Sequence, residues 1–354
     1  MVYIPEEILD YIIHCAAERD VGRNFNSASL ISHTSLTSHA FHQILLPYKF
    51  RSLTFQMRHD RQTTVIPISK FCEAINAEDP HALSLAPLVQ ELSLLRWWWF
   101  SGGSHIPAFK KTVNSVLSLR NLTKLNIEKC FTTPVIMEQL GKLVQLQSLH
   151  TWGCEVEFTD EEAKGVSYGA LSKLQSLHTL ECNEDRYYFV GYLDNIPMEN
   201  LRILKSGDLE VTHTMLTTDP SLLQLKELWL TLRYYKDYPL LWNFLARVTS
   251  LTHLSLPRLK LSDGPSSPNF AFRELQYLHI HVAFVPWFAD QPLKMIKIDT
   301  ESLSGQLMKE VRDYWQGIVF PYAEDLATDR RRKEMDRIPI EFWREFLPNV
   351  KKVG

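Results

Sequence analysis

Residues 146–154 read LQSLHTWGC and residues 174–182 read LQSLHTLEC, so seven of nine positions are identical across a separation of 28 residues. In both nonapeptides leucine occupies offsets 0 and 3, threonine occupies offset 5 and cysteine occupies offset 8. Residues 122–130, LTKLNIEKC, follow the same pattern with isoleucine at offset 5. Because self-similarity at a regular spacing is the signature of a repeat architecture, this pattern decides the fold.

The same frame extends over most of the chain. Its successive units are separated by 33, 24, 28, 27, 24, 26, 24 and 18 residues. Most of these intervals lie within the range of about 20–29 residues that is typical of leucine-rich repeats (LRRs). The units start at Val89, Leu122, Leu146, Leu174, Leu201, Leu225, Leu251, Leu275 and Leu293.

The pattern predicts an α/β solenoid. Offsets 3 and 5 alternate, so their side chains point to the same side of a short strand. Apolar residues between the strands have helical spacing, for example over residues 135–143 and 240–248. A strand followed by a helix, repeated, stacks into a parallel sheet, with strands on the concave face and helices on the convex face. No single unit can bury its own apolar face, so the array is the domain.

The two ends of the chain differ from the array. At the C-terminal end, apolar residues four apart predict a helix over 303–319, and residues 303–354 are interpreted as a helical C-terminal cap. The N-terminal residues show no repeat and predict three short helices, too small to form a core alone. We therefore divide the chain into an α-helical segment at 1–55, a connecting segment at 56–88 and leucine-rich repeats at 89–302.

Composition narrows the possible function classes. The chain has 354 residues, with 38 Lys and Arg against 41 Asp and Glu, giving a net charge of −3. This balance does not favour nucleic acid or an anionic membrane as a partner. No uncharged apolar run approaches the roughly 18 residues that span a bilayer. The five cysteines are odd in number, which predicts reduced thiols and a place in the cytoplasm or nucleus, without metal or other cofactor.

The N-terminal segment resembles an F-box, a helical motif that opens with Leu-Pro-x-Glu. Here the opening reads Ile-Pro-Glu-Glu-Ile-Leu at residues 4–9. Residues 36–41, LTSHAF, stand where the family has its Val-Cys-basic-x-Trp stretch, with Phe41 in place of Trp. Residues 46–54, LPYKFRSLT, look like the segment that follows the box in many fungal F-box proteins. A box followed by leucine-rich repeats identifies the chain as similar to fungal-type F-box proteins with an LRR domain.

This resemblance implies a role in an SCF-type E3 ubiquitin ligase. The box would dock on a Skp-type adaptor held by a cullin–RING ligase, and the repeats would bind the protein to be ubiquitinated, with no catalysis by this chain. Two alternatives remain: an LRR interaction scaffold with a helical N-terminal cap, and a serine hydrolase acting through Ser167. The expected adaptor contacts are Ile4, Pro5, Ile8, Leu9, Ile12, Ile13, Leu30, Leu36 and Phe41.

The offsets between the buried ones predict the substrate-binding surface. Offsets 2, 4 and 6 should face outward, and they carry aromatic and histidine side chains that an inert surface rarely has. A solvent-exposed ladder of stacked side chains is the alternative interpretation. The predicted substrate-binding residues are His150, Trp152, His178, Trp229, Tyr277, His279 and His281.

Other motifs have ordinary structural explanations beside their functional ones. The cysteines at offset 8, Cys130, Cys154 and Cys182, fit either a zinc site or the buried loop position of each repeat. Residues 165–169, GVSYG, match the G-x-S-x-G nucleophile elbow but follow an acidic stretch, which favours a loop. The WWWF run at 97–100 could anchor a partner, and the basic run at 330–333 could be a localisation signal or an exposed helical face.

Overall fold

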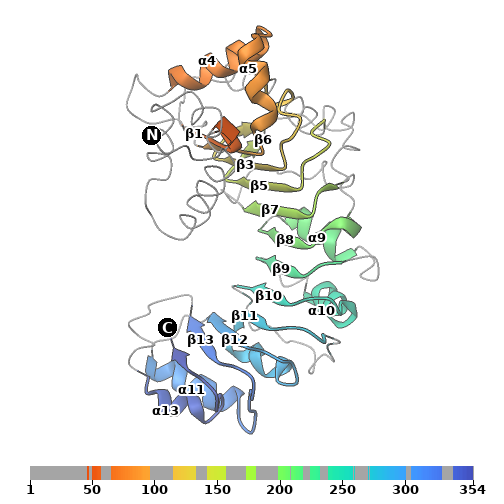
Figure 1. Ribbon diagram of the computed structural model, residues 1–354. Helices are drawn as coiled ribbons and strands as arrows, with labels where there is room; N and C mark the ends of the chain where they lie inside the picture. Colours follow the sequence, from red (N-terminus) through yellow and green to blue (C-terminus); the bar gives the residue numbers. More distant parts are fainter. Residues whose placement is uncertain are drawn as a thin grey trace, which may run out of the picture. The chain divides into compact units, whose positions relative to one another are not determined.

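The computed structural model describes residues 46–47, 50–56, 65–95, 115–132, 142–156, 173–180, 198–207, 209–217, 224–231, 238–257, 259, 270, 272–299, 304–328 and 338–353. The chain divides into two compact units, Met1–Asn126 and Ile127–Gly354. Figure 1 shows both units, and each is described separately here. Apart from residues 46–47, 50–51 and 142–143, the predicted F-box helices and the predicted helix at 135–143 lie outside the described residues.

The first unit contains strands β1 (Ser52–Gln56) and β2 (Glu91–Leu95), which pair in parallel with Leu53 opposite Leu92. Between them lie helices α4 (Val65–Asn76) and α5 (Pro80–Leu85) and the 3-10 turn η1 (Ala86–Leu88). Asp79 caps α5 by accepting a hydrogen bond from the Ala82 N–H at 2.8 Å. Thus the predicted connecting segment 56–88 contains helices, and the end of the predicted helical segment 1–55 is a strand.

The second unit is built on parallel strands, in the sheet order β5-β7-β8-β9-β10-β11-β12-β13-β14. Neighbouring strands in this order pair in parallel, as the repeat predicts. Strand β3 (Lys124–Glu128) crosses the boundary between the units, and β4 (Phe131–Thr132) pairs with β6 (Glu155–Val156) in a separate small sheet. Strands β5 and β7 to β14 span, in this order, Ser148–Trp152, Ser176–Leu180, Ile203–Ser206, Glu227–Leu230, His253–Leu256, Tyr277–His281, Met295–Asp299, Asp325–Thr328 and Lys352–Val353.

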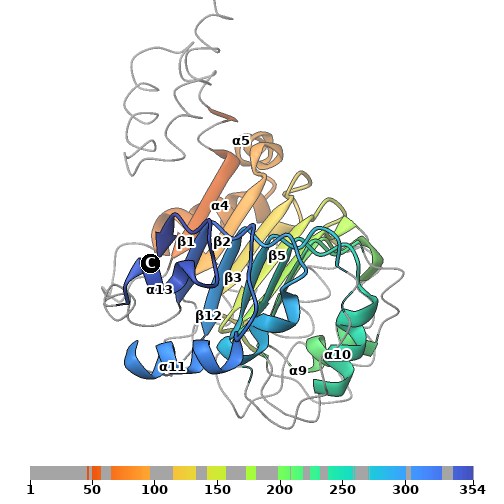
Figure 2. The same ribbon diagram turned by 90° about the horizontal axis from the view of Figure 1, so that it is seen from below.

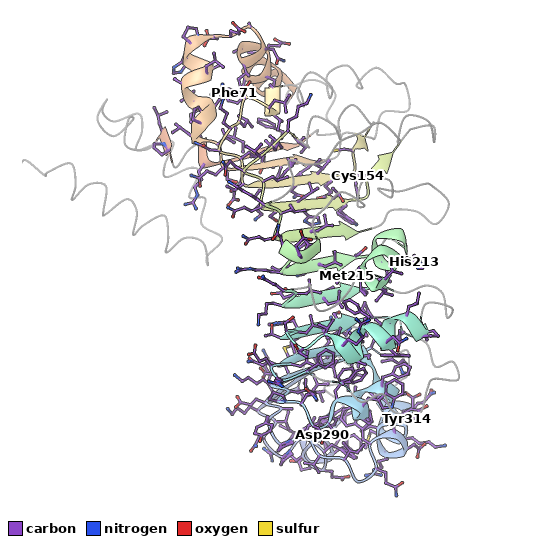
Figure 3. All side chains as sticks on the ribbon, turned by 90° about the vertical axis from the view of Figure 1, so that its right-hand side faces the viewer. Phe71, Cys154, His213, Met215, Asp290 and Tyr314 are labelled. Carbon is purple, nitrogen blue, oxygen red and sulfur yellow. The ribbon has the colours of Figure 1, made fainter. Side chains whose placement is uncertain are left out.

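Helices α9 (Leu209–Thr217) and α10 (Tyr238–Arg247) lie on the outer side of the arc that β7 to β12 form (Figure 1). Figure 2 shows the same helices together at one side of the stacked strands. On α9, Met215 is fully buried whereas His213, two residues earlier, is exposed (both labelled in Figure 3). This contrast follows from the helical period, which turns residues two apart toward different sides. The helix predicted over 240–248 is confirmed by α10.

A row of apolar side chains at offset 3 forms the interior of the second unit. Each of these side chains is at most 2% exposed and stands opposite its counterpart on the next strand. The predicted burial of this offset is therefore confirmed. The row consists of Leu149, Leu177, Leu204, Leu228, Leu254, Leu278, Ile296 and Leu326.

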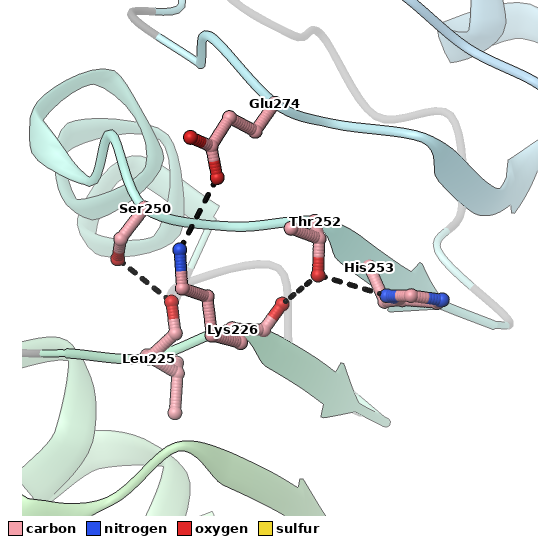
Figure 4. Close-up of polar contacts among 6 residues, drawn as sticks. All are labelled: Leu225, Lys226, Ser250, Thr252, His253 and Glu274. Carbon is pink, nitrogen blue, oxygen red and sulfur yellow. Dashed lines mark hydrogen bonds and ion pairs between the residues drawn. The ribbon is translucent and has the colours of Figure 1, made fainter.

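The residue before each strand joins neighbouring repeats through its carbonyl. The Lys226 carbonyl accepts hydrogen bonds from the N–H groups of Thr252 and His253, at 2.9 and 3.0 Å. The Thr252 hydroxyl donates to the same carbonyl at 3.1 Å, and Lys226 bonds Glu274 at 3.2 Å (Figure 4). The same double acceptance recurs at Gln147, Gln175, Arg202, Thr252, Gln276, Lys294 and Glu324.

The C-terminal part closes the last repeat around Trp315, which is fully buried. Its indole N–H donates to the Val282 carbonyl at 2.9 Å, and its ring meets Phe320 edge-on at 5.2 Å. Helices α11 (Ser304–Tyr314) and α13 (Ile340–Arg344) lie here, and α11 agrees with the predicted helix. The region is not purely helical, because β13 pairs with β12 and β14 pairs with β13.

Because Leu228 is fully buried in the offset-3 row, we expect Leu228→Ala to lower the free energy of unfolding by about 2–5 kcal/mol. The matched control is Glu227→Gln, one residue earlier and half-exposed, which should change it by less than about 1 kcal/mol. Urea unfolding followed by circular dichroism measures both. A larger loss for Glu227→Gln than for Leu228→Ala would contradict the register.

Candidate functional site

The side chains at offset 4 of the repeats form a row across the strands of the second unit. The offset-4 row runs His150, His178, Lys205, Trp229, Ser255, His279, Lys297 and Ala327, each opposite the next on its neighbouring strand. The parallel register places such residues about 4.8 Å apart from strand to strand. The offset-4 residues therefore line up across the strands as the repeat frame predicts, close enough for their side chains to contact one another.

The first pair of this row is His150 on β5 and His178 on β7, whose ring centroids lie 5.2 Å apart. Both rings are half-exposed. The Thr151 hydroxyl, one residue after His150, donates to the His178 carbonyl at 3.4 Å and ties the two strands together. The two nonapeptides predict that His150 and His178 lie next to each other, and the structure confirms this.

Trp229 on β9 lies at the centre of the row. The Lys205 ammonium lies over the indole at 4.5 Å from the ring centroid, and Glu227 lies 3.7 Å from the same ammonium. Tyr277 stacks on the indole with centroids 6.0 Å apart and planes 14° apart. The indole Nε1 is buried and has no hydrogen-bond partner in the described part of the chain. Trp229 is thus held by a cation on one neighbour and a ring on another.

Ser255 on β10 explains how Trp229 reaches across a strand to Tyr277 on β11. The serine is fully buried and small, so the rings on both sides close over it. Its Oγ lies 2.8 Å from His279 Nδ1, forming a hydrogen bond. His279 is only 3% exposed and meets Trp229 edge-on at 6.4 Å.

The prediction that His279 is an exposed contact residue is therefore wrong, although its position in the row is right. The neighbouring serine leaves a space that the imidazole fills, and the Trp229 ring covers it. His279 therefore contacts the Trp229 ring rather than solvent. We call Lys205, Trp229, His253, Tyr277 and His279 the Trp229 cluster.

Two members of this cluster are absent from the sequence-based list of binding residues. His253 stacks on Tyr277 at 5.6 Å, and its Nδ1 lies 2.9 Å from the Thr252 hydroxyl (Figure 4). Lys205 stands at offset 4 of its repeat, the offset of Trp229. The repeat frame places both residues on the outward face, so the sequence contained the information needed to predict them. Selecting mainly aromatic and histidine side chains left Lys205 out.

Trp152 and His281 lie at the ends of their strands, with other local roles. Trp152 is 38% exposed, and Lys129 lies over its ring at 4.8 Å. The Lys129 backbone has φ 52° and donates its N–H to the Trp152 carbonyl at 2.7 Å. His281 accepts the Ala283 N–H at 3.3 Å and so caps the 3-10 helix η7 (Val282–Phe288).

The offset-8 thiols that the structure describes bond to backbone carbonyls. Cys130 is fully buried and donates to the Glu128 carbonyl at 3.3 Å, and Cys154 donates to the Ile127 carbonyl at 3.3 Å. Within the described residues, no group of three or more His, Cys, Asp or Glu could hold a metal ion. These cysteines therefore act as turn positions of the repeat.

The remaining sequence-based candidates lie outside the described residues. They comprise all predicted adaptor contacts, Ser167 of the G-x-S-x-G match, Cys182, the WWWF run at 97–100 and the basic run at 330–333. Among the helices that the structure does describe, none is long and apolar enough to cross a membrane.

Comparisons with known proteins identify the repeat. The family described as leucine-rich repeat region matches residues 71–313, more than half of the chain. An internalin (inlF) from Listeria monocytogenes is 16% identical, with a TM-score of 0.36, covering 82% of this chain and 89% of that chain. The Rad7 and Elc1 complex in yeast gives 14% identity and a TM-score of 0.38, covering 99% and 92%. None of the curated proteins matches.

The Ser255–His279 hydrogen bond provides a test of how the cluster is supported. Ser255→Ala removes a buried hydrogen bond to the His279 imidazole, so we expect the free energy of unfolding to fall by about 1–3 kcal/mol. Near-ultraviolet circular dichroism should also change, because Trp229 rests against His279. Ser93→Ala, at a half-exposed strand position, is the control and should alter neither signal. An unchanged Ser255→Ala variant would contradict this role.

Proposed function

This chain belongs to the leucine-rich-repeat family, and from that premise we propose that it is the substrate-recognition subunit of an SCF-type E3 ubiquitin ligase. In this role the N-terminal F-box docks on a Skp-type adaptor, and through it on a cullin–RING ligase. The outward strand face binds the protein that is to be ubiquitinated. The observation that carries the proposal is the combination of an F-box-like opening at residues 4–9 with an array of leucine-rich repeats.

The apolar character of the N-terminal segment supports an adaptor partner. Ile8, Leu9 and Ile12 have the spacing of one helical face, in a segment too short to bury such a face by itself. A partner protein with a complementary groove would cover it, as helix-in-groove recognition does. Ligases of this kind act in the cytoplasm or nucleus, where the five cysteines would stay reduced. The chain would contribute binding and no catalytic residue.

The Trp229 cluster supports a binding role for the strand face. Aromatic side chains that are already held in place supply contact area with little loss of conformational entropy. Trp and Tyr are also the residue types that dominate the affinity of protein interfaces. The second candidate function, an interaction scaffold outside any ligase, uses the same face but needs no adaptor, so the two differ in what the N-terminal segment binds.

Two variants test the N-terminal segment and the outward strand face separately. The double substitution Ile8→Asp and Leu9→Asp puts charges in the proposed adaptor interface, which we expect to abolish co-purification with the Skp-type adaptor. Trp229→Ala should retain the adaptor and weaken substrate binding by about 2 kcal/mol, close to thirtyfold. Co-expression with the adaptor, followed by affinity purification and mass spectrometry of the bound proteins, measures both.

Each variant serves as the control of the other, because the substitutions lie in different parts of the chain. Both proteins should show the far-ultraviolet circular dichroism of the wild type. Adaptor recovery at the wild-type yield by the double variant would contradict the proposed F-box contacts, whereas a wild-type chain that recovers no adaptor would favour the scaffold. Loss of the adaptor by Trp229→Ala would mean that the adaptor binds the repeats instead.

A further inference from the structure

We propose that the Trp229 cluster recognises an extended, acidic segment of the bound protein. This inference rests on the proposed binding role of the strand face and adds the chemistry of what is bound there. Three properties of the cluster lead to it: the orientation of the rings, the charges along the offset-4 row, and the pairing of the strands beneath.

Neighbouring side chains already cover the faces of the Trp229 indole. Lys205 lies over the indole of Trp229 at 4.5 Å, and Tyr277 stacks on it with planes 14° apart. In the sheet order β8 lies on one side of β9, whereas β10 and β11 lie on the other, so we infer that Lys205 and Tyr277 cover opposite faces of the ring. A ring in this position presents its edge outward, and aromatic edges carry the positive part of the quadrupole. The cluster therefore suits an anion better than a cation, which would need a free ring face.

The charges of the row agree with this orientation. From β5 to β13 the offset-4 positions include Lys205, Lys297 and histidines but no Asp or Glu. Glu227, on the same strand as Trp229, lies 3.7 Å from the Lys205 ammonium. Charge complementarity of this kind selects partners and speeds their association.

The strands under the cluster determine how a partner can approach. Each of β8, β9, β10 and β11 pairs with a neighbour on both of its edges. A partner strand therefore cannot add to the sheet at this point through backbone hydrogen bonds. Recognition must use side chains across the strands, which an extended segment with exposed carboxylates can provide.

Fluorescence anisotropy on the full chain tests the inference. The probe is a short fluorescein-labelled peptide in which glutamates alternate with serines, beside matched peptides with glutamine or lysine at the glutamate positions. We expect only the acidic peptide to bind, more weakly at high salt. Lys205→Gln should weaken its affinity by about three- to fivefold, as for a partly exposed ion pair. Trp229→Ala should weaken it by about tenfold or more.

The matched control is Lys226→Gln. Lys226 belongs to the same repeat as Trp229 but lies outside the offset-4 row, in an ion pair with Glu274. Its substitution changes the net charge as Lys205→Gln does and should leave the affinity within about twofold. Equal losses from both lysine variants would mean that net charge, not the cluster, attracts the peptide, and would overturn the proposal.

Two further results would also overturn it: binding of the lysine peptide as tightly as the acidic one, or tighter binding of a fluorescein-labelled single-stranded oligonucleotide than of the acidic peptide. The proposed function is tested separately. If the acidic peptide does not bind but Trp229→Ala abolishes co-purification of the substrate, the proposal of an acidic segment is wrong and the proposed receptor role is retained. If the adaptor fails to bind but the peptide behaves as expected, the ligase role is wrong and the surface stands.

Discussion

Each repeat depends on its neighbours to bury the leucine at offset 3, because a single strand has nothing to cover that side chain. In the second unit this row is excluded from solvent from Leu149 to Leu326. The carbonyl before each strand accepts two backbone N–H groups from the next repeat, which holds the strands in one register. A slip of one residue would expose the whole row, so the hydrophobic effect sets the pairing of every strand at once.

That register also arranges the outward face, where function is proposed. Once Leu204, Leu228 and Leu254 are aligned, Lys205, Trp229 and Ser255 must be aligned as well, one position further along each strand. The close contact of Lys205 with Trp229 is thus a consequence of leucine burial on the other side of the sheet. The surface is as regular as the core because the same pairing produces both.

The sequence was sufficient to predict what depends on the leucine pattern and insufficient where neighbouring side chains decide. The frame from the two nonapeptides predicts the buried row and the adjacent histidines, His150 and His178. It does not predict the burial of His279, since that follows from the small size of Ser255 on the next strand. Strands β1 and β14 also escaped prediction, because a lone or very short strand gives no repeat signal, and pairing with a neighbour stabilises it.

The way the Trp229 cluster is held has a consequence for binding. A large flexible side chain that is ordered only on association loses conformational freedom, and this loss reduces the affinity. Trp229 is already restrained by Lys205 and Tyr277, and His279 contacts it edge-on. The same contacts limit the binding free energy that the cluster can contribute. Lys205 already interacts with Glu227 at 3.7 Å, so a bound carboxylate must share that ammonium. Binding at this surface should therefore depend more on ring contacts that exclude water than on the ion pair, and the indole should matter more than the lysine.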